Sequence, residues 1–225
     1  EKTLDTTDEW IKSRSGIERR HFAAEGETTS MLATKAAQAA LTNAGMTADD
    51  VDAIVLATST ADLTFPSAAT MVQANLGMSK GFAFDIQAVC AGFVFGLSNA
   101  NAMILSGQAK RVLVIGAETF SRIMDWTDRG TCVLFGDGAG ALLLEAEEGA
   151  GDSGDRGILS TDLNSDGTHR DLLYVDGGVS TGTSGYLRMQ GNQVFRHAVG
   201  KLAATATTAI ERANVTTDDV DWIVP

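Results

Sequence analysis

Cys90 is the residue whose type and position best suit covalent chemistry. It follows the apolar run Gly81–Gln87 and directly precedes a second apolar run, in the sequence QAVCAGF. A thiol between a strand and a helix N-terminus feels the positive end of the helix dipole, which lowers its pKa and favours the nucleophilic thiolate. Ala88, Ala91 and Gly92 leave room for a substrate. A cysteine in an apolar stretch is equally a buried small residue, so position alone leaves both interpretations open.

The other thiol and the imidazoles are weaker candidates. Cys132 lies inside the apolar run GTCVLFG and is expected to be structural. A nucleophilic cysteine usually has a histidine partner, but His21, His169 and His197 do not follow predicted strand ends. We expect these three to be structural or surface residues. The two cysteines have no disulfide or zinc-site spacing, so the sequence predicts no metal.

A basic cluster stands out against the acidic background of the chain. Lys12, Arg14, Arg19 and Arg20 follow Trp10 within a few residues. Guanidinium groups bind phosphates through forked donors, and an indole can stack on a base, so the cluster fits a nucleotide-containing ligand. A solvated charged turn is the alternative.

Helical and strand patterns alternate along the chain and must position these residues. Alternation of this kind predicts an α/β fold with a mostly parallel sheet that is covered by helices on both faces. GDGAGA, residues 136–141, loosely fits a dinucleotide-binding motif but is predicted to be a tight turn, because the ALLLE that follows is too short and too apolar for the required helix. The predicted helices span residues 28–44, 67–77 and 91–106, and the predicted strands span residues 51–57, 81–87, 111–116 and 141–145.

An internal repeat indicates two related halves. Residues 40–55 (ALTNAGMTADDVDAIV) align without gaps on residues 209–224 (AIERANVTTDDVDWIV), with nine of 16 positions identical. Each copy reads as a helix end, a DDVD turn and a strand. The Gly/Asp-rich stretch 149–157 marks the predicted boundary, which gives one half at 1–149 with Cys90 and the start of a second at 150–225. The second copy stops after its strand, so we expect a truncated second half.

Composition narrows the class of protein. The net charge of −12 argues against partners such as nucleic acid or an anionic membrane, which require positive fields. No apolar run reaches the roughly 18 residues of a membrane helix, and the first residues do not resemble a signal peptide. These features predict a cytoplasmic α/β protein.

Taken together, several stretches resemble the β-ketoacyl-acyl-carrier-protein synthase III family of thiolase-like condensing enzymes. They are DTTDEWIKSRSGIERRH, FPSAA, AFDIQAVCAGF, DWTDRGT, LFGDGAGA, MQGNQVF and DDVDWIVP, and they cover the length of the chain. The resemblance implies a layered αβαβα thiolase-type fold of two pseudo-twofold-related halves, the second incomplete. It also implies an enzyme that transfers an acyl group from acyl-CoA, with acetyl-CoA as the expected donor, to a cysteine. The acyl group is then condensed with malonyl-acyl-carrier protein to start fatty-acid synthesis. Metal and redox cofactors are not required for this chemistry.

The resemblance also implies roles for single residues. Cys90 matches the nucleophile, and its backbone N–H matches part of the oxyanion hole. Trp10 and Arg129 match the pair that sandwiches the CoA adenine, and Arg14 matches a phosphate contact. Phe65 matches a residue that a partner subunit inserts into the acyl pocket, which implies a homodimer. The family's pocket-lining positions correspond to Phe120, Phe135, Leu187 and Met189.

The chain also departs from the family pattern. The family's first strand precedes the position of Glu1, and its His-Gln-Ala-Asn motif and a later asparagine follow the position of WIVP. We therefore expect a chain truncated at both ends that can accept an acyl group and does not condense it. Three alternatives remain at this point: a ketosynthase of a secondary pathway, a thioesterase-like enzyme that hydrolyses the acyl-cysteine, and a non-catalytic acyl-CoA-binding homologue.

Overall fold

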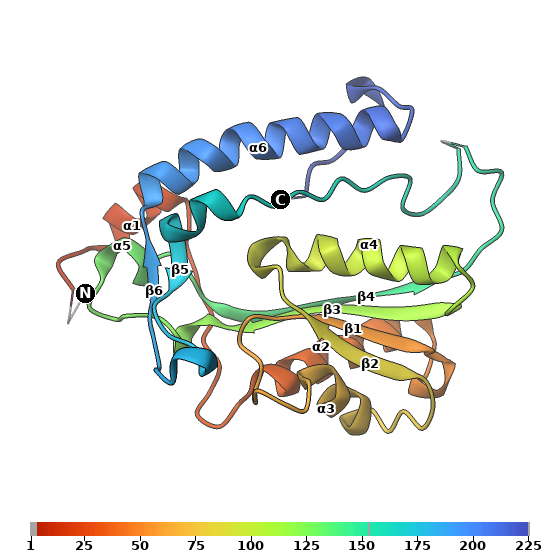
Figure 1. The fold of residues 1–225 in the computed structure, drawn as a ribbon, viewed down its shortest axis with the longest axis horizontal. Coiled ribbons are helices and arrows are strands. Elements are labelled where there is room, and N and C mark those ends of the chain that lie inside the picture. The colour runs from red at the N-terminus through yellow and green to blue at the C-terminus, as the bar shows by residue number, and fades with distance from the viewer. Residues whose placement is uncertain (1–3, 153, 225) are drawn as a thin grey trace.

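A four-stranded mixed sheet forms the centre of the protein (Figure 1). The computed structural model describes residues 4–152 and 154–224. The strand order is β2-β1-β3-β4, with β1 parallel to both neighbours and β3 antiparallel to β4, so the predicted mostly parallel sheet is confirmed. The strands of this sheet are β1 (Ala53–Ala57), β2 (Phe82–Ile86), β3 (Arg111–Thr119) and β4 (Asp137–Glu145).

Helices and a small hairpin surround the sheet. The hairpin pairs β5 antiparallel with β6. Figure 1 shows α2 and α3 on one side of the sheet and α4 on the other, with α6 on the same side as α4. The remaining elements are α1 (Asp8–Ser15), α2 (Thr29–Ala44), α3 (Ala68–Asn75), α4 (Gly92–Leu105), α5 (Arg129–Cys132), β5 (Leu173–Val175), β6 (Leu187–Met189), α6 (Gly191–Arg212) and the short 3-10 helices η1 (Ala48–Asp50), η2 (Val89–Ala91), η3 (Phe120–Arg122), η4 (Gly167–Leu172), η5 (Val179–Thr181) and η6 (Thr217–Asp219).

Burial of β1 explains both layers of the core. All five residues of β1 are buried, and successive side chains of a strand point to opposite faces. Ile54 and Leu56 belong to the core cluster that contains Ala33 of α2, whereas Val55 belongs to the cluster that contains Ala100 of α4. A β-branched strand without a polar face is stable only between two layers of helices.

Close contact between α4 and the sheet depends on small residues at every fourth position. Gly92, Gly96 and Ala100 are the buried residues of α4. A Cβ added at Gly96 would lie 3.0 Å from Val114 Cγ1, and one added at Gly92 would lie 3.0 Å from Ala57 Cβ. Larger residues would therefore push α4 away from β1 and β3, and would move the turn that precedes this helix.

The sequence repeat is a structural repeat up to its final strand. Thr47 and Asp50 form a capping box around η1, and Thr216 and Asp219 form the same box around η6. In both boxes the carboxylate accepts the threonine backbone N–H at 2.8 Å. The predicted second-copy strand is wrong for the described residues, because 220–224 pair with no other strand.

The predicted turn at residues 136–141 is also wrong. These residues enter β4, which begins at Asp137 rather than at Ala141. Gly138 pairs with Glu118 and Gly140 pairs with Gly116, so β3 supplies the hydrogen-bonding partner that outweighs the weak strand propensity of glycine. Residues 146–166, which include the predicted boundary at 149–157, contain no helix or strand in their described part.

Candidate active site

Cys90 lies in η2, where the chain passes from the end of β2 to the start of α4. The preceding residue, Val89, has a φ of 48°. A β-branched residue rarely adopts this left-handed conformation, and strain of this kind persists where the surrounding structure holds a functional turn. Cys90 is exposed, whereas Cys132 is buried, as the sequence predicted for the second thiol.

The expected lowering of the Cys90 pKa is wrong. Burial of the sulfur raises the pKa of the Cys90 thiol, and the negative charge of Glu118 raises it further. Cys90 is exposed at the surface, yet the protein around its sulfur excludes enough water to disfavour the thiolate. A backbone hydrogen bond at Cys90 lowers this pKa, but by less than the loss of solvent raises it.

Sequence reasoning did not identify Glu118, which lies at the end of β3. Its carboxylate accepts the Ser59 backbone N–H at 2.8 Å and also accepts the Thr60 hydroxyl. Burial raises the pKa of this carboxyl group. The available signal was a single acidic residue at the end of the apolar run RVLVIGA. Glu118 therefore joins β3 to the loop that follows β1 and places a carboxylate near Cys90.

A cavity opens at the carboxyl ends of β1 and β2. Its volume is about 540 Å³, and it is lined by residues 58–59 and 61–64, by residues 85–87 and by Val179. Open α/β sheets bind ligands at this end of their strands. Phe65 follows directly in the same loop, and its side chain is 81% exposed.

Trp10 of α1 and Arg129 of α5 are in direct contact, although they lie far apart in the sequence. The guanidinium carbon of Arg129 is 4.7 Å from the centroid of the Trp10 ring. Thr7 caps α1 by accepting the Trp10 backbone N–H, and Asp128 caps α5 by accepting the Gly130 N–H. The two caps set the ends of the helices that bring the indole and the guanidinium together.

The basic cluster separates into different environments. Arg20 donates to the backbone oxygens of Cys132 and Phe135 at 2.6 and 2.7 Å, which makes it structural. Lys12 pairs with Asp8 at 2.9 Å. Arg14 is exposed and lies four residues after Trp10 on the same face of α1. Of the cluster, Arg14 is therefore well placed to bind a ligand that stacks on Trp10.

Two of the four predicted pocket residues are in contact, and a third is hydrogen-bonded to the segment that follows η3. The rings of Phe120 and Phe135 lie 5.4 Å apart between centroids. Leu187 is buried, and its backbone N–H donates to Ile123 at 2.8 Å, just after η3. Met189 is half-buried and shares the face of β6 that carries Leu187. Phe65 is exposed and lies outside this group.

The remaining candidate features are the histidines, metal-binding clusters and membrane-spanning helices. The rings of His169 and His197 lie 4.0 Å apart, and His21 is exposed. In residues 4–152 and 154–224, no cluster of three or more His, Cys, Asp or Glu side chains could hold a metal ion. No helix of this described part is long and apolar enough to cross a membrane.

Comparison with known proteins identifies the family. The family model for 3-Oxoacyl-[acyl-carrier-protein (ACP)] synthase III matches residues 84–167, which include Cys90. The β-ketoacyl-acyl-carrier-protein synthase III of Roseobacter denitrificans is 81% identical over 225 residues, covering all of this chain and 70% of that protein. The chain belongs to the β-ketoacyl-acyl-carrier-protein synthase III family. The enzyme of the same name from Rhodobacter capsulatus is 75% identical and is also covered to 70% of its length.

Solved structures of synthase III enzymes share the fold. The enzyme from Aquifex aeolicus superposes with a TM-score of 0.89 at 43% identity, over 97% of this chain and 67% of that one. The enzyme from Pseudomonas aeruginosa superposes with a TM-score of 0.88 at 40% identity, over 97% of this chain and 66% of that one. The thiolase-type fold expected from the sequence is therefore confirmed.

Proposed function

We propose that Cys90 is the nucleophile that accepts the acyl group in this synthase III. The enzyme starts fatty-acid synthesis by condensing an acyl-CoA with malonyl-acyl-carrier protein, as a member of its family. The observation that carries the proposal for Cys90 is its position after a left-handed Val89, at the junction of β2 and α4. The matched family segment spans this junction.

Acyl transfer at Cys90 is a thiol–thioester exchange. The sulfur attacks the acyl carbonyl of acyl-CoA, and the Cys90 backbone N–H stabilises the negative oxygen of the tetrahedral intermediate. The C–S bond to CoA then breaks. The proton that leaves Cys90 ends on the CoA sulfur, so the products are acyl-Cys90 and free CoA.

Condensation returns Cys90 to its free form. Loss of CO2 from malonyl-acyl-carrier protein leaves a carbanion, which attacks the acyl carbonyl on Cys90. A carbon–carbon bond forms as the bond from sulfur to the acyl group breaks. The β-ketoacyl chain leaves on the carrier protein, and the Cys90 thiolate takes up a proton from solvent.

Binding of CoA is assigned to α1 and α5. Trp10 and Arg129 would hold the adenine between them, and Arg14 would contact a phosphate. Two stacked contacts of about 3.5 Å each need the planes roughly 7 Å apart, which is more than the 4.7 Å between the guanidinium carbon and the indole centroid. The indole and the guanidinium must therefore move apart when CoA binds, and Arg129 Nη1 donates to the Asp5 backbone oxygen at 2.6 Å before they do.

A short acyl group is the expected donor chain. The bulky rings of Phe120 and Phe135 lie 5.4 Å apart and fill space that a long chain would need. Leu187 and Met189 complete the proposed pocket from β6. Acetyl-CoA is therefore the expected starter.

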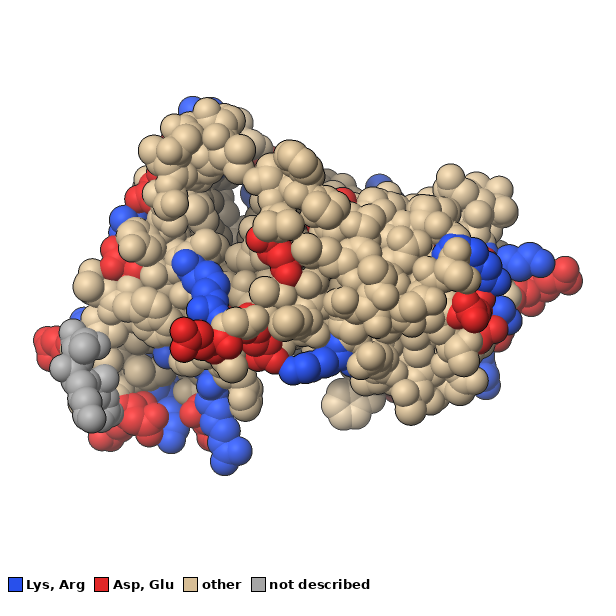
Figure 2. All heavy atoms as spheres, turned by 90° about the horizontal axis from the view of Figure 1, so that it is seen from below, with Lys and Arg blue, Asp and Glu red and all other residues tan. Residues whose placement is uncertain are grey.

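A homodimer completes the proposed pocket. Phe65 is 81% exposed, and burial of such a ring would favour association. Asp62 in the same loop accepts the backbone N–H and hydroxyl of Ser30 at 2.8 and 2.7 Å, which holds the loop against α2. Seen from below, charged side chains gather in the left half and at the right end, and a mostly uncharged surface lies between them (Figure 2), as in the centre of many interfaces. We also infer a cytoplasmic location, where acyl-CoA and carrier-protein substrates are made.

Intact-mass spectrometry after incubation with acetyl-CoA tests the assignment of Cys90. The wild-type enzyme should gain the mass of one acetyl group and release one CoA. Cys90→Ala should abolish the gain, whereas Cys132→Ala should keep it, because Cys132 is buried away from solvent. Labelling that persists in Cys90→Ala would overturn the proposal.

Addition of malonyl-acyl-carrier protein separates the remaining alternatives. The proposed function requires a β-ketoacyl-carrier product, with a preference for malonyl-carrier protein over malonyl-CoA. Repeated release of CoA without a condensed product would favour the thioesterase alternative, because acylation of Cys90 alone releases one CoA per enzyme and stops. Equal use of malonyl-CoA would favour a ketosynthase of a secondary pathway.

A further inference from the structure

Arg188 lies between two residues of the proposed acyl pocket. It is the middle residue of β6, flanked by Leu187 and Met189. Because side chains alternate along a strand, Arg188 points to the face opposite its two neighbours. Its interactions therefore fix the position of β6 without occupying the pocket.

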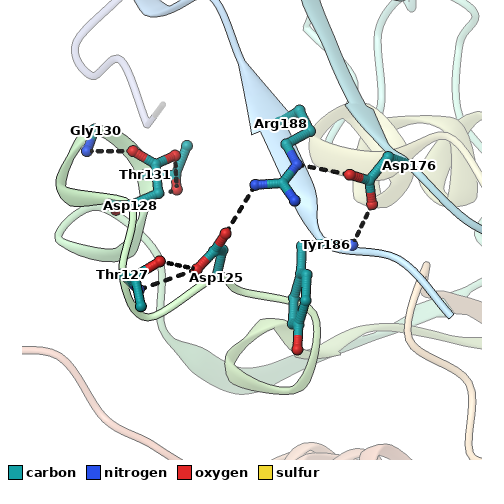
Figure 3. A network of polar contacts seen from close by, with 8 residues as sticks. All are labelled: Asp125, Thr127, Asp128, Gly130, Thr131, Asp176, Tyr186 and Arg188. Atoms are coloured by element: carbon teal, nitrogen blue, oxygen red, sulfur yellow. Dashed lines mark hydrogen bonds and ion pairs between the residues drawn. The ribbon is translucent and has the colours of Figure 1, made fainter.

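Two carboxylates from different segments hold the Arg188 guanidinium (Figure 3). Nη1 lies 2.8 Å from Asp125 Oδ2, and Nε lies 2.7 Å from Asp176 Oδ2. The guanidinium carbon is also 5.7 Å from the centroid of the Tyr186 ring. We call Arg188, Asp125 and Asp176 the Arg188 bridge.

Each carboxylate of the bridge also orders its own loop. Asp125 accepts the Thr127 backbone N–H at 3.0 Å and the Thr127 hydroxyl at 2.6 Å. Asp176 accepts the Tyr186 backbone N–H at 2.6 Å, which closes the neck of the β5–β6 hairpin. Hydrogen bonds to Thr127 and Arg188 lower the pKa of Asp125 to about 2, so this carboxylate is charged at neutral pH.

The Arg188 bridge connects the proposed acyl pocket to the proposed CoA site. Asp125 precedes α5, the helix that carries Arg129. The hairpin loop closed by Asp176 carries Val179, which lines the cavity beside residues 58–59 and 61–64. A substitution at Arg188 would therefore change the positions of β6, of α5 and of the hairpin loop that carries Val179.

We propose that Arg188 is a positioning residue, which holds β6 against the loop before α5 and thereby sets the preference for short acyl groups. The inference rests on the proposed function, because it assigns the acyl pocket to Leu187 and Met189. Partly exposed ion pairs make only a modest contribution to folding stability. The principal effect of the bridge is therefore on the position of β6. A change in this position is measured as a change in the ratio of kcat/KM for two acyl-CoA substrates.

The test measures kcat/KM of the intact enzyme for acetyl-CoA and hexanoyl-CoA. Arg188→Leu removes both ion pairs, so β6 should move outward and acetyl-CoA should lose its advantage by about tenfold. Arg188→Lys should restore only part of this preference, because an ammonium group lacks the guanidinium fork. Asp125→Asn combined with Arg188→Leu should change the acetyl to hexanoyl ratio of kcat/KM no further than Arg188→Leu alone, as expected for residues of one network.

Arg111→Leu is the matched control. Arg111 forms an ion pair with Glu145 at 2.6 Å between β3 and β4, and its side chain is 36% exposed against 37% for Arg188. Its loss should lower the melting temperature to a similar extent and leave the acetyl to hexanoyl ratio unchanged.

Three results would separate the possible failures. An unchanged ratio in a folded Arg188→Leu enzyme would overturn the positioning role. An equal change in Arg111→Leu would also overturn it, because the effect would then come from general destabilisation. Absence of acyl-Cys90 in the wild-type enzyme with every acyl-CoA tested would instead overturn the proposed function.

Discussion

Burial raises the pKa of the Cys90 thiol, and the carboxylate of Glu118, at the end of β3, raises it further. Glu118 is fixed by the Ser59 backbone N–H at 2.8 Å, so its charge has a defined position relative to the sulfur. Because two negative charges repel, removing this charge should favour the thiolate. The relationship makes Cys90 a less acidic thiol than its place before a helix predicts.

Glu118→Gln should therefore lower the pKa of Cys90 and speed its alkylation by iodoacetamide near neutral pH. Glutamine keeps an oxygen that can accept the Ser59 N–H. The rate should be measured against pH, and its midpoint should lie at lower pH in Glu118→Gln than in the wild type. Glu145→Gln, which removes a carboxylate that pairs with Arg111, serves as the control. A Glu118→Gln midpoint at or above the wild-type value would contradict the prediction.

Trp10→Ala and Arg129→Ala should each raise the KM for acetyl-CoA by about tenfold, since base stacking contributes about 1–3 kcal/mol. Acetyl-pantetheine, which lacks the adenine, should show no comparable loss. Trp10 also packs against the buried Met124 and Cys132 cluster, so Trp10→Phe tests whether a remaining aromatic ring restores binding. Equal losses with both substrates would point to unfolding rather than to adenine binding.

Arg14→Ala should weaken acetyl-CoA binding more at low salt than at high salt, because mobile ions screen an exposed phosphate contact. Binding should be measured by titration calorimetry at several ionic strengths. Arg19→Ala is the matched control, since Arg19 is exposed in the same cluster but is not assigned a phosphate. A loss that does not change with salt would indicate a packing role for Arg14.

Acid should weaken the fold in part through Asp125. Its pKa lies at about 2 in the folded protein, below its ordinary value of 3.8, because Thr127 and Arg188 favour the charged form. A depressed pKa stabilises the fold above the unfolded value, and this stabilisation is lost as the pH falls toward 2. Urea unfolding should therefore show a smaller drop between about pH 4 and 2 for Asp125→Asn. Parallel curves for the two proteins would contradict this assignment.

Phe65→Ser should shift the enzyme from dimer toward monomer in analytical ultracentrifugation, because the proposed interface would lose its most exposed aromatic ring. Leu105→Ser is the matched control. Leu105 is 79% exposed at the end of α4, against 81% for Phe65. Phe65→Ser should also change acyl-chain preference if the ring enters the pocket of the partner. A dimer of unchanged affinity would contradict the proposed role of Phe65.

Local patterns predicted much of the fold. Periodicity placed α2 and β1 to within a few residues, because one face of α2 and all of β1 are buried in the core. The position of Cys90 between a predicted strand and a predicted helix singled it out. The family resemblance added Arg129, because no local sequence pattern predicts its contact with Trp10.

Features that depend on distant neighbours were not predicted. Gly138 and Gly140 form strand because β3 lies beside them, and the pKa of Cys90 depends on solvent exclusion and on Glu118. The Arg188 bridge unites three segments whose separate sequences contain ordinary charged residues. Such effects arise only after the chain has folded.

The two Thr-x-x-Asp turns also bear on how the chain begins to fold. The turn around η1 leads into a fully buried strand, whereas the turn around η6 leads into residues 222–224, which are 84–90% exposed. The same capping box forms in both settings, and the residue two positions before each threonine is left-handed, with Gly45 at a φ of 66° and Asn214 at 55°. Its information is therefore local, and each half has a turn that can form before any sheet does. A duplicated sequence would then supply two independent starting points for folding, each about as fast as closure of a single short loop.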